Sequence, residues 1–438
     1  MTITENKNIM VDLFCGGGGA SEGIKRATGR EPDLAVNHDE DAIEMHKANH
    51  PRAHHEQQNV WYVRPSRFRN KQVQLLWLSP DCRHFSRSKG GKPVSTRVRS
   101  LARSAIPWAK LPYRSKPELI CLENVSEFQE WGPLRDGKPI QSRKGELFKR
   151  FVADLEKEGY NVDYKVLNAA DYGAPTARKR LVLVAKLHGE VQWPELTHGP
   201  RTNNPYHTAA ECVDWSIPTK SIFDRKKPLA EKTQARLARG FVRYVVDNPE
   251  GAYDVPSWAL KFYGTSTGQD LSKPLSTVSA QGQHHALCQA WIAKHYGGVV
   301  GQKLQAPLGT VTAVDHHSLC TAHAGDEDAK VERVVAWIER YYSSGGHSSS
   351  LRKPMPTITT IDRMSLVIAF IRNNRVVDIR LRMFTPRELA RAMGFPDTYV
   401  LTGTKRSQIA RIGNAVCPAM AEAVVRANWR PNQLRVAA

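Results

Sequence analysis

The sequence lacks the patterns that mark secreted, zinc-binding and membrane proteins. It has seven cysteines, an odd number, and no two are spaced as Cys-x-x-Cys, which argues against a disulfide framework and a zinc ribbon. No apolar run reaches the length of about 18 residues that a membrane span needs, and the first residues are mostly polar. These absences predict a protein of the reducing cytoplasm, with no signal peptide and no membrane partner.

Acidic residues are scarce relative to basic ones. The chain has 438 residues, enough for two domains, and 63 Lys and Arg against 43 Asp and Glu give a net charge of +20. Net charge says nothing about fold, but a strongly basic protein is suited to a polyanionic partner. Nucleic acid is the commonest such partner, and a basic enzyme with an unrelated substrate is the alternative.

The first half of the chain alternates short apolar runs with segments of helical pattern. The apolar runs, each expected to be a strand, are residues 9–14, 34–36, 75–78, 119–122 and 181–185. Residues 20–28 and 41–49 have the pattern of helices. This alternation predicts a doubly wound α/β domain, in which chemistry takes place at the carboxyl ends of the strands.

The composition changes after residue 190, where Pro, Gly, Ser, Thr and His become common. A Pro-x-x-Thr-Val/Ile-Ser/Thr core recurs there, at residues 274–279, 307–312 and 354–359. β-Branched residues behind a proline predict a strand pair for each copy within a small β-rich domain. We expect a helix over residues 329–341 to interrupt the copies, and another helix to begin after Thr385 and end at Gly394.

Two candidate sites lie in turns after predicted strands. Residues 15–19 (Cys-Gly-Gly-Gly-Gly) fit a cradle for a nucleotide or cofactor, although a structural turn fits equally, and the absence of Gly-x-Gly-x-x-Gly disfavours a dinucleotide. Cys82 lies beside Arg83 and His84, and an electropositive setting lowers the pKa of a thiol and makes it a better nucleophile. A buried, inert cysteine is the alternative.

Two further candidates carry charge at strand ends. Glu123 ends an apolar run, where a carboxylate can hydrogen-bond or protonate a ring nitrogen of a substrate, or cap a helix. Arg178 and Arg180 precede the last run, where basic side chains can hold a base carbonyl or a phosphate, or form a solvated loop. Each signal is modest by itself, but all of them fall where an α/β sheet gathers its functional groups.

Taken together, these segments resemble the DNA cytosine-5 methyltransferase family, bacterial or phage type, over nearly the whole chain. The matching segments, in the family's order, are residues 11–19, 81–86, 123–125, 168–180, 382–396 and 412–418. The resemblance implies a Rossmann-like S-adenosylmethionine-dependent methyltransferase domain with a smaller β-rich target-recognition domain. Residues 1–190 would be the catalytic domain, residues 191–380 the recognition domain with its three β repeats, and residues 381–438 a segment that returns to the catalytic domain.

The resemblance also implies roles for particular residues. Cys82 would add to C6 of a flipped-out cytosine before methylation at C5, Glu123 would contact N3 and the exocyclic amine, and Arg178 and Arg180 would hold the O2 edge. The residues implied at the cofactor, S-adenosylmethionine, are Asp12, Phe14, Gly16, Gly18, Asn37, His38, Asn59 and Asn414. Those implied at double-stranded DNA are Ser86, Lys89, Lys92 and Thr176. A monomer in a bacterial or phage-infected cell, associated with the nucleoid, is expected, and restriction–modification, regulation and phage self-protection stay open as its role.

The chain departs from the family pattern at four residues. Asp81 stands where the family has Pro, and Arg83 where it has Gln. Asn37 and Asn59 stand where the family has acidic residues at the cofactor; Asn can still accept a hydrogen bond, but a modified cofactor is an alternative.

The substrate and the activity each leave a second interpretation open. A tRNA cytosine-5 methyltransferase of similar fold would have a small recognition region, so the long insert between Leu187 and Arg382 favours DNA. A catalytically inactive DNA-binding relative is disfavoured because Cys82 and Glu123 are both present.

Overall fold

The computed structural model divides into two compact units, and each is described by itself. The first consists of Met1–His207, Pro354–Ile361 and Leu389–Ala438, and the second of Thr208–Lys353 and Asp362–Glu388. The residues that the structure describes are 6–82, 84–85, 95–230, 233–235, 237–238, 242, 253–254, 260–261, 285–286, 291–294, 302–303, 317–320, 333–340, 348–360, 364–372 and 375–430.

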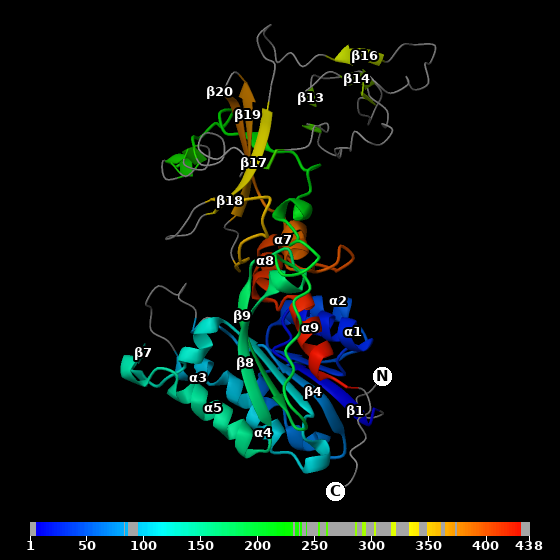
Figure 1. Cartoon of the computed structure of the whole chain (residues 1–438), viewed down its shortest axis with the longest axis vertical. Helices are drawn as coiled ribbons and strands as arrows, with labels where there is room; N and C mark the ends of the chain where they lie inside the picture. Colours follow the sequence, from blue (N-terminus) through cyan, green and yellow to red (C-terminus); the bar gives the residue numbers. More distant parts are fainter. Residues whose placement is uncertain are drawn as a thin grey trace. The chain divides into compact units, whose positions relative to one another are not determined.

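A seven-stranded sheet forms the centre of the first unit (Figure 1). Its strands are β1 (Asn8–Leu13), β2 (Leu34–Asn37), β3 (His54–Gln57), β4 (Gln72–Leu78), β5 (Leu119–Asn124), β8 (Asn161–Asn168) and β9 (Lys179–Lys186). Their spatial order is β3-β2-β1-β4-β5-β9-β8; β1 to β5 run parallel, and β9 pairs antiparallel with both β5 and β8. The strand order reverses between β1 and β4, so a crevice opens at their carboxyl ends. The predicted α/β fold is confirmed.

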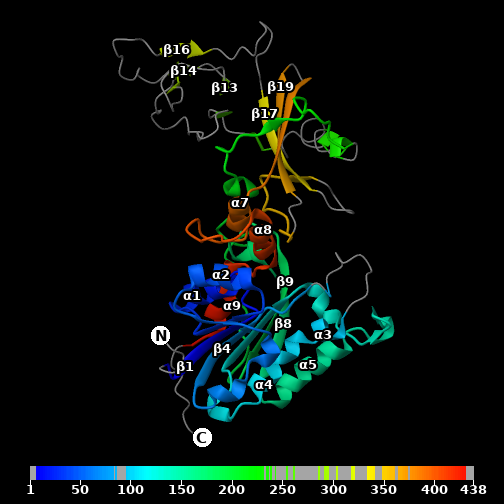
Figure 2. The ribbon, with the colours of Figure 1, turned by 180° about the vertical axis from the view of Figure 1, so that it is seen from behind.

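Helices cover both faces of this sheet (Figures 1 and 2). They are α1 (Gly19–Thr28), α2 (Glu40–Asn49), α3 (Thr96–Arg99), α4 (Ile106–Ala109), α5 (Glu146–Lys157) and α9 (Pro418–Asn428). The helix α8 (Lys405–Asn414) lies at the carboxyl ends of the strands. On α5, Phe148, Phe151 and Leu155 recur at helical spacing and are buried in the core with the strands. The small hairpin of β6 (Leu134–Arg135) and β7 (Lys138–Pro139) precedes α5.

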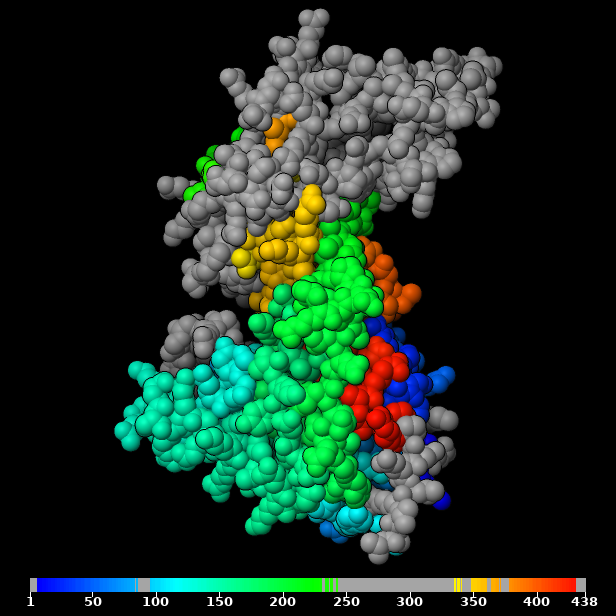
Figure 3. Space-filling model, viewed as in Figure 1, coloured from blue at the N-terminus to red at the C-terminus, as the bar shows by residue number. Residues whose placement is uncertain are grey.

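The last helix of the chain packs against the first. Figure 3 shows the C-terminal segment, in red, beside the N-terminal one, in blue. The approach is close at Gly23 in α1, where an added Cβ would lie 2.5 Å from the Pro418 carbonyl oxygen and 2.6 Å from the Cβ of Ala421. Only glycine leaves room for α9 at this distance, so α1 and α9 pack directly on each other within the first unit.

The second unit contains a six-stranded sheet with the order β10-β20-β19-β17-β11, and β18 pairs with β17. Its strands are β10 (Lys220–Ser221), β11 (Tyr253–Asp254), β17 (Arg333–Arg340), β18 (Ser348–Ser350), β19 (Met364–Arg372) and β20 (Arg375–Met383). Shorter strands between β11 and β17 form two separate sheets. In one, β12 (Leu260–Lys261) pairs with β13 (His285–Ala286); in the other, β14 (Trp291–Lys294) pairs with β15 (Gln302–Lys303) and β16 (His317–Cys320). Val335, Trp337 and Val367 are buried in its core.

The helix expected over residues 329–341 is wrong, because β17 occupies residues 333–340 and pairs along its whole length with β19. Its valines, tryptophan and isoleucine suit a strand, and cross-strand pairing outweighs the helical periodicity. The helix expected after Thr385 is confirmed as α7 (Pro386–Ala392). Glu388 accepts from the backbone N–H of Thr385 at 2.8 Å, and the Thr385 hydroxyl accepts from the N–H of Glu388, which is a capping box.

The third copy of the repeated core differs from the expected strand pair. Residues 354–359 run outside any sheet, and only an isolated bridge links Met355 to Thr176 within the first unit. The cores of the other two copies, residues 274–279 and 307–312, lie outside the described residues.

We expect Gly23→Ala to lower the free energy of unfolding by about 1–3 kcal/mol, because the new methyl group would collide with α9. Helix propensity alone would raise stability by up to about 1 kcal/mol, so the sign of the effect separates the two causes. Urea denaturation of the full chain measures it, and a variant at least as stable as the wild type would contradict the close packing.

Candidate active site

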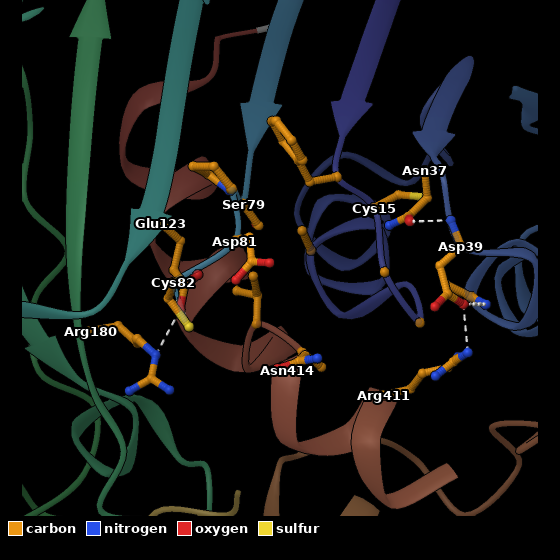
Figure 4. Close-up of a pocket in the computed structure, with 18 of the residues that line it drawn as sticks. Cys15, Asn37, Asp39, Ser79, Asp81, Cys82, Glu123, Arg180, Arg411 and Asn414 are labelled. Carbon is orange, nitrogen blue, oxygen red and sulfur yellow. Dashed lines mark hydrogen bonds and ion pairs between the residues drawn. The ribbon is translucent and has the colours of Figure 1, made fainter. Parts of the chain in front are cut away.

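A pocket of about 220 Å³ lies where the carboxyl ends of the parallel strands meet (Figure 4). Its lining comes from the turn after β1, the ends of β2, β4 and β5, the start of β9 and the end of α8. Its polar and reactive lining residues are Cys15, Asn37, His38, Asp39, Ser79, Asp81, Cys82, Glu123, Arg178, Arg180, Arg411 and Asn414. The site therefore occupies the crevice at which the strand order reverses.

Cys82, Glu123 and Arg180 lie together at one end of this pocket (Figure 4). The Nε of Arg180 is 3.1 Å from Oε1 of Glu123, and both side chains are largely buried. Asn124, the next residue on β5, donates from its amide to the Pro80 carbonyl at 3.0 Å. This hydrogen bond holds the loop that carries the thiol against the strand that carries the carboxylate.

Burial controls the protonation of Cys82 and Glu123. It raises the pKa of the Cys82 thiol, and the neighbouring Arg180 lowers it in opposition. Burial also raises the pKa of Glu123, again opposed by Arg180 and Arg178. The Cys82 thiol is therefore protonated at neutral pH, while the guanidinium of Arg180 favours the charged forms of both neighbours.

Arg178 has a different environment from Arg180. Its guanidinium is buried, with Nη1 donating to the Ile358 carbonyl at 3.1 Å and Nη2 donating to the Ala415 carbonyl at 3.0 Å. Burial lowers its pKa to about 10, so it stays a cation at neutral pH. Arg178 lines the pocket, but its terminal nitrogens join three distant stretches of backbone, which is the geometry of a positioning residue.

A second pocket of about 190 Å³ adjoins the first, because Phe14, Asn37, His38 and Asp81 line both. Val60 and Trp61 give it an apolar wall. Of the residues expected at the cofactor, the first pocket contains Phe14, Gly16, Asn37, His38 and Asn414, and the second contains Asn59.

Asp12 and Gly18, also expected at the cofactor, line neither pocket. Asp12 is buried beneath the glycine turn, where it accepts from the Ser21 hydroxyl at 2.6 Å. A Cβ at Gly18 would lie 2.2 Å from the hydroxyl of Tyr399, so this glycine is needed for packing. Asp12 therefore supports the turn from below, and Gly18 is the point at which the turn packs against Tyr399.

The two asparagines at family acidic positions use their oxygens within the chain. Oδ1 of Asn37 accepts from the backbone N–H of Asp39 at 2.9 Å, and Oδ1 of Asn59 accepts from that of Trp61 at 3.1 Å. Each side chain also has an amide nitrogen, so these positions offer a donor that a carboxylate would lack.

Of the residues expected at DNA, the structure describes Thr176 alone. Thr176 is fully buried, and its hydroxyl donates to the Pro356 carbonyl at 3.4 Å. This burial does not fit a contact with DNA and reflects the bridge to residues 354–359. Ser86, Lys89 and Lys92 lie outside the described residues.

Sequence reasoning missed the residues that hold the glycine turn and the end of α8. Arg411 pairs with Asp39 at 2.5 Å and with Asp41 at 2.7 Å, which fastens α8 to α2. The Tyr399 hydroxyl donates to the Gly17 carbonyl at 2.7 Å. In the sequence, Arg411 directly precedes the segment 412–418, and this position could have indicated its role. Nothing in the sequence around Tyr399 indicates its contact with the glycine turn.

A chain of buried polar side chains runs beneath the glycine turn. The Ser21 hydroxyl, which donates to Asp12, is also 2.8 Å from Nε2 of His46. Nδ1 of His46 is in turn 2.8 Å from Nε2 of His55. Burial raises the pKa of Asp12 to about 7 and lowers that of His55 to about 4. Oδ1 of Asp12 has no hydrogen-bond partner within the described chain. A buried oxygen without a partner costs less free energy in a protonated acid than in a carboxylate.

Within the described ranges, no group of His, Cys, Asp and Glu side chains is arranged to hold a metal ion. In the same part of the chain, no helix combines the length and apolarity that crossing a membrane requires.

Comparison with known proteins gives one family for nearly the whole chain: residues 9–429 match C-5 cytosine-specific DNA methylase. The Type II methyltransferase M1.HphI of Haemophilus parahaemolyticus is 23% identical over 433 residues, which cover 96% of this chain and 87% of that protein. DNA (cytosine-5)-methyltransferase 1B of Oryza sativa subsp. japonica is 24% identical over 472 residues, covering 96% of this chain and 28% of that protein. The crystal structure of a Spodoptera frugiperda DNMT2 mutant is 16% identical with a TM-score of 0.50, covering 97% of this chain and 100% of that one, a likeness of fold.

We expect Asp12→Asn to change how stability depends on pH. Between pH 3.8 and about 7 the folded chain keeps a proton on Asp12 that the unfolded chain has lost, so Asp12 lowers the free energy of unfolding as pH rises. The free energy of unfolding of the Asn variant minus that of the wild type should therefore increase across this window by about 4 kcal/mol. Urea denaturation at a series of pH values measures it, and a constant difference would contradict a protonated Asp12.

The charges around Cys82 should control its alkylation by iodoacetamide. Arg180→Gln removes the cation that lowers the thiol pKa, so the pH midpoint of the reaction should rise, whereas Asp81→Asn should lower it. Lys179→Gln, an exposed neighbour on β9, is the matched control and should leave the midpoint unchanged. Equal midpoints in all four proteins would contradict this electrostatic environment.

Proposed function

Because the chain belongs to the C-5 cytosine-specific DNA methylase family and is a DNA cytosine-5 methyltransferase, we propose that Cys82 is its nucleophile and Glu123 its cytosine-binding acid. The observation that carries this proposal is a single pocket in which the thiol, the Glu123–Arg180 pair and the glycine turn all face one space. A base inside a duplex cannot reach such a pocket, so the cytosine must be flipped out at a cost of a few kcal/mol.

The proposed chemistry begins with the thiol. The Cys82 thiol passes its proton to water and its sulfur adds to C6 of the cytosine, while Glu123 donates a hydrogen bond to N3 and accepts one from the exocyclic amine. The raised pKa of Glu123 suits a group that shares a proton with a ring nitrogen. After methylation, water takes the C5 proton, the C5–H electron pair forms the C5–C6 double bond, and the C6–S bond breaks to release the Cys82 thiolate. Arg180 holds Glu123 in place, and Arg178 is a positioning residue.

We assign S-adenosylmethionine to the two adjoining pockets. When bound, it supplies the electrophilic methyl group. The carboxylate of Asp81 and the ring of Phe14 suit a sulfonium cation, and the wall of Val60 and Trp61 suits an adenine. The amide donors of Asn37 and Asn59 would meet ring nitrogens or ribose oxygens.

We propose that the second unit recognises the target sequence in double-stranded DNA, since it contains most of the insert that separates the family segments. The enzyme would act as a monomer in the cytoplasm of a bacterial or phage-infected cell, associated with the nucleoid. Relatives named as Type II methyltransferases support a role in restriction–modification, with regulation and phage self-protection as alternatives.

The test is covalent trapping on duplex DNA that contains 5-fluorocytosine, in the presence of S-adenosylmethionine. Fluorine at C5 cannot leave as a cation, so the wild type should form an adduct that survives denaturation. Cys82→Ala should form none, and Glu123→Gln should form it at least about a hundredfold more slowly. Cys212→Ala, a buried cysteine of the second unit, is the matched control and should trap normally.

An adduct that persists in Cys82→Ala would overturn the assignment of the nucleophile. An adduct on tRNA with none on DNA would overturn the assignment of the substrate. Sequencing the trapped DNA would identify the target site.

A further inference from the structure

A basic pocket of about 520 Å³ lies on the second unit and shares no lining residue with the active site. It is built around the edge strand β10, which pairs with β20 on one side. The residues that line it are Thr219, Lys220, Ser221, Asp224, Arg225, Lys226, Lys227 and Arg380. Five side chains are thus cationic and one is a carboxylate, a concentration of positive charge in one hollow.

The loop that carries these cations is anchored to the sheet. The backbone N–H of Ile222 donates to the Ile379 carbonyl at 2.9 Å, and the Ile222 side chain packs against the core of the unit. The Ser221 hydroxyl donates to Asp378 at 2.7 Å. These contacts fix the path of the chain just before Phe223, whose side chain is 66% exposed. The pocket is therefore held in shape by contacts with the sheet.

Four of the five cations of the pocket have no ion-pair partner among the residues that the structure describes. Asp378 pairs with Arg380 at 2.6 Å, but none of Lys220, Arg225, Lys226 and Lys227 forms an ion pair with a described residue. All four are exposed. Such a cluster on a strand edge attracts a polyanion, and the exposed ring of Phe223 adds an apolar surface that a sugar can cover.

We propose that this pocket binds phosphates of the DNA backbone and so orients the second unit on the duplex without reading sequence. The inference rests on the proposed function, because it takes the DNA substrate as the polyanion. Exposed Lys and Arg side chains contact backbone phosphates, and such contacts provide register and affinity instead of base selectivity.

The test is the salt dependence of binding to a fluorescein-labelled DNA duplex of arbitrary sequence, measured by fluorescence anisotropy. The triple variant Arg225→Gln, Lys226→Gln, Lys227→Gln should bind more weakly, and the slope of log K against log salt should fall by about three. The matched control removes the same charge from α5, with Lys149→Gln, Arg150→Gln and Lys157→Gln, all exposed. Its slope should change by less than about one.

Equal losses in the two triple variants would overturn the pocket in favour of a general effect of net charge, and no loss in the pocket variant would overturn it outright. The trapping experiment separates this proposal from the function on which it rests. A wild type that forms the adduct, together with a pocket variant of unchanged slope, contradicts the phosphate site alone. A wild type that forms no adduct contradicts the proposed chemistry, whatever the slopes.

Discussion

The geometry of the pocket depends on the two hydrogen bonds that the buried guanidinium of Arg178 donates to backbone carbonyls. Its acceptors, the carbonyls of Ile358 and Ala415, lie 180 and 237 positions away in the sequence. Leaving a buried cation without acceptors costs several kcal/mol, so the three stretches of backbone assemble together or not at all. Because Ala415 lines the pocket and Arg180 lies two residues from Arg178, this contact sets how far the wall of α8 stands from Glu123.

Desolvation makes the groups of this pocket unlike the same groups in water. The Cys82 thiol and the Glu123 carboxyl both favour their protonated forms because they are buried, and Arg180 is the neighbour that opposes this for each of them. A thiol held protonated resists oxidation and adventitious alkylation. In the proposed mechanism, reactivity then depends on a substrate that brings its own hydrogen-bonding groups to Glu123, which links the chemistry to correct occupation of the pocket.

The sequence predicts the sheet and the strand-end residues well, because a buried parallel strand has a simple apolar signature. Cys82, Glu123 and Asn37 follow such runs, and the structure brings all three to one pocket. Contacts over long sequence separation leave no local signal, so the carbonyl partners of Arg178 and the burial of Thr176 could not be predicted. Residues 333–340 have a pattern compatible with either a helix or a strand, and only pairing with β19 decides between them.

The first unit is composed of stretches from the beginning, the later middle and the end of the chain. During translation the ribosome therefore releases Cys82 and Glu123 long before α9, the helix that packs on Gly23, has been made. Until residues 415–428 have been made, a nascent chain contains the Cys82 thiol but lacks the Ala415–Val416 wall of its pocket, and the face of α1 that packs on α9 stays uncovered. Assembly of the pocket is thus timed by the synthesis of residues 415–428.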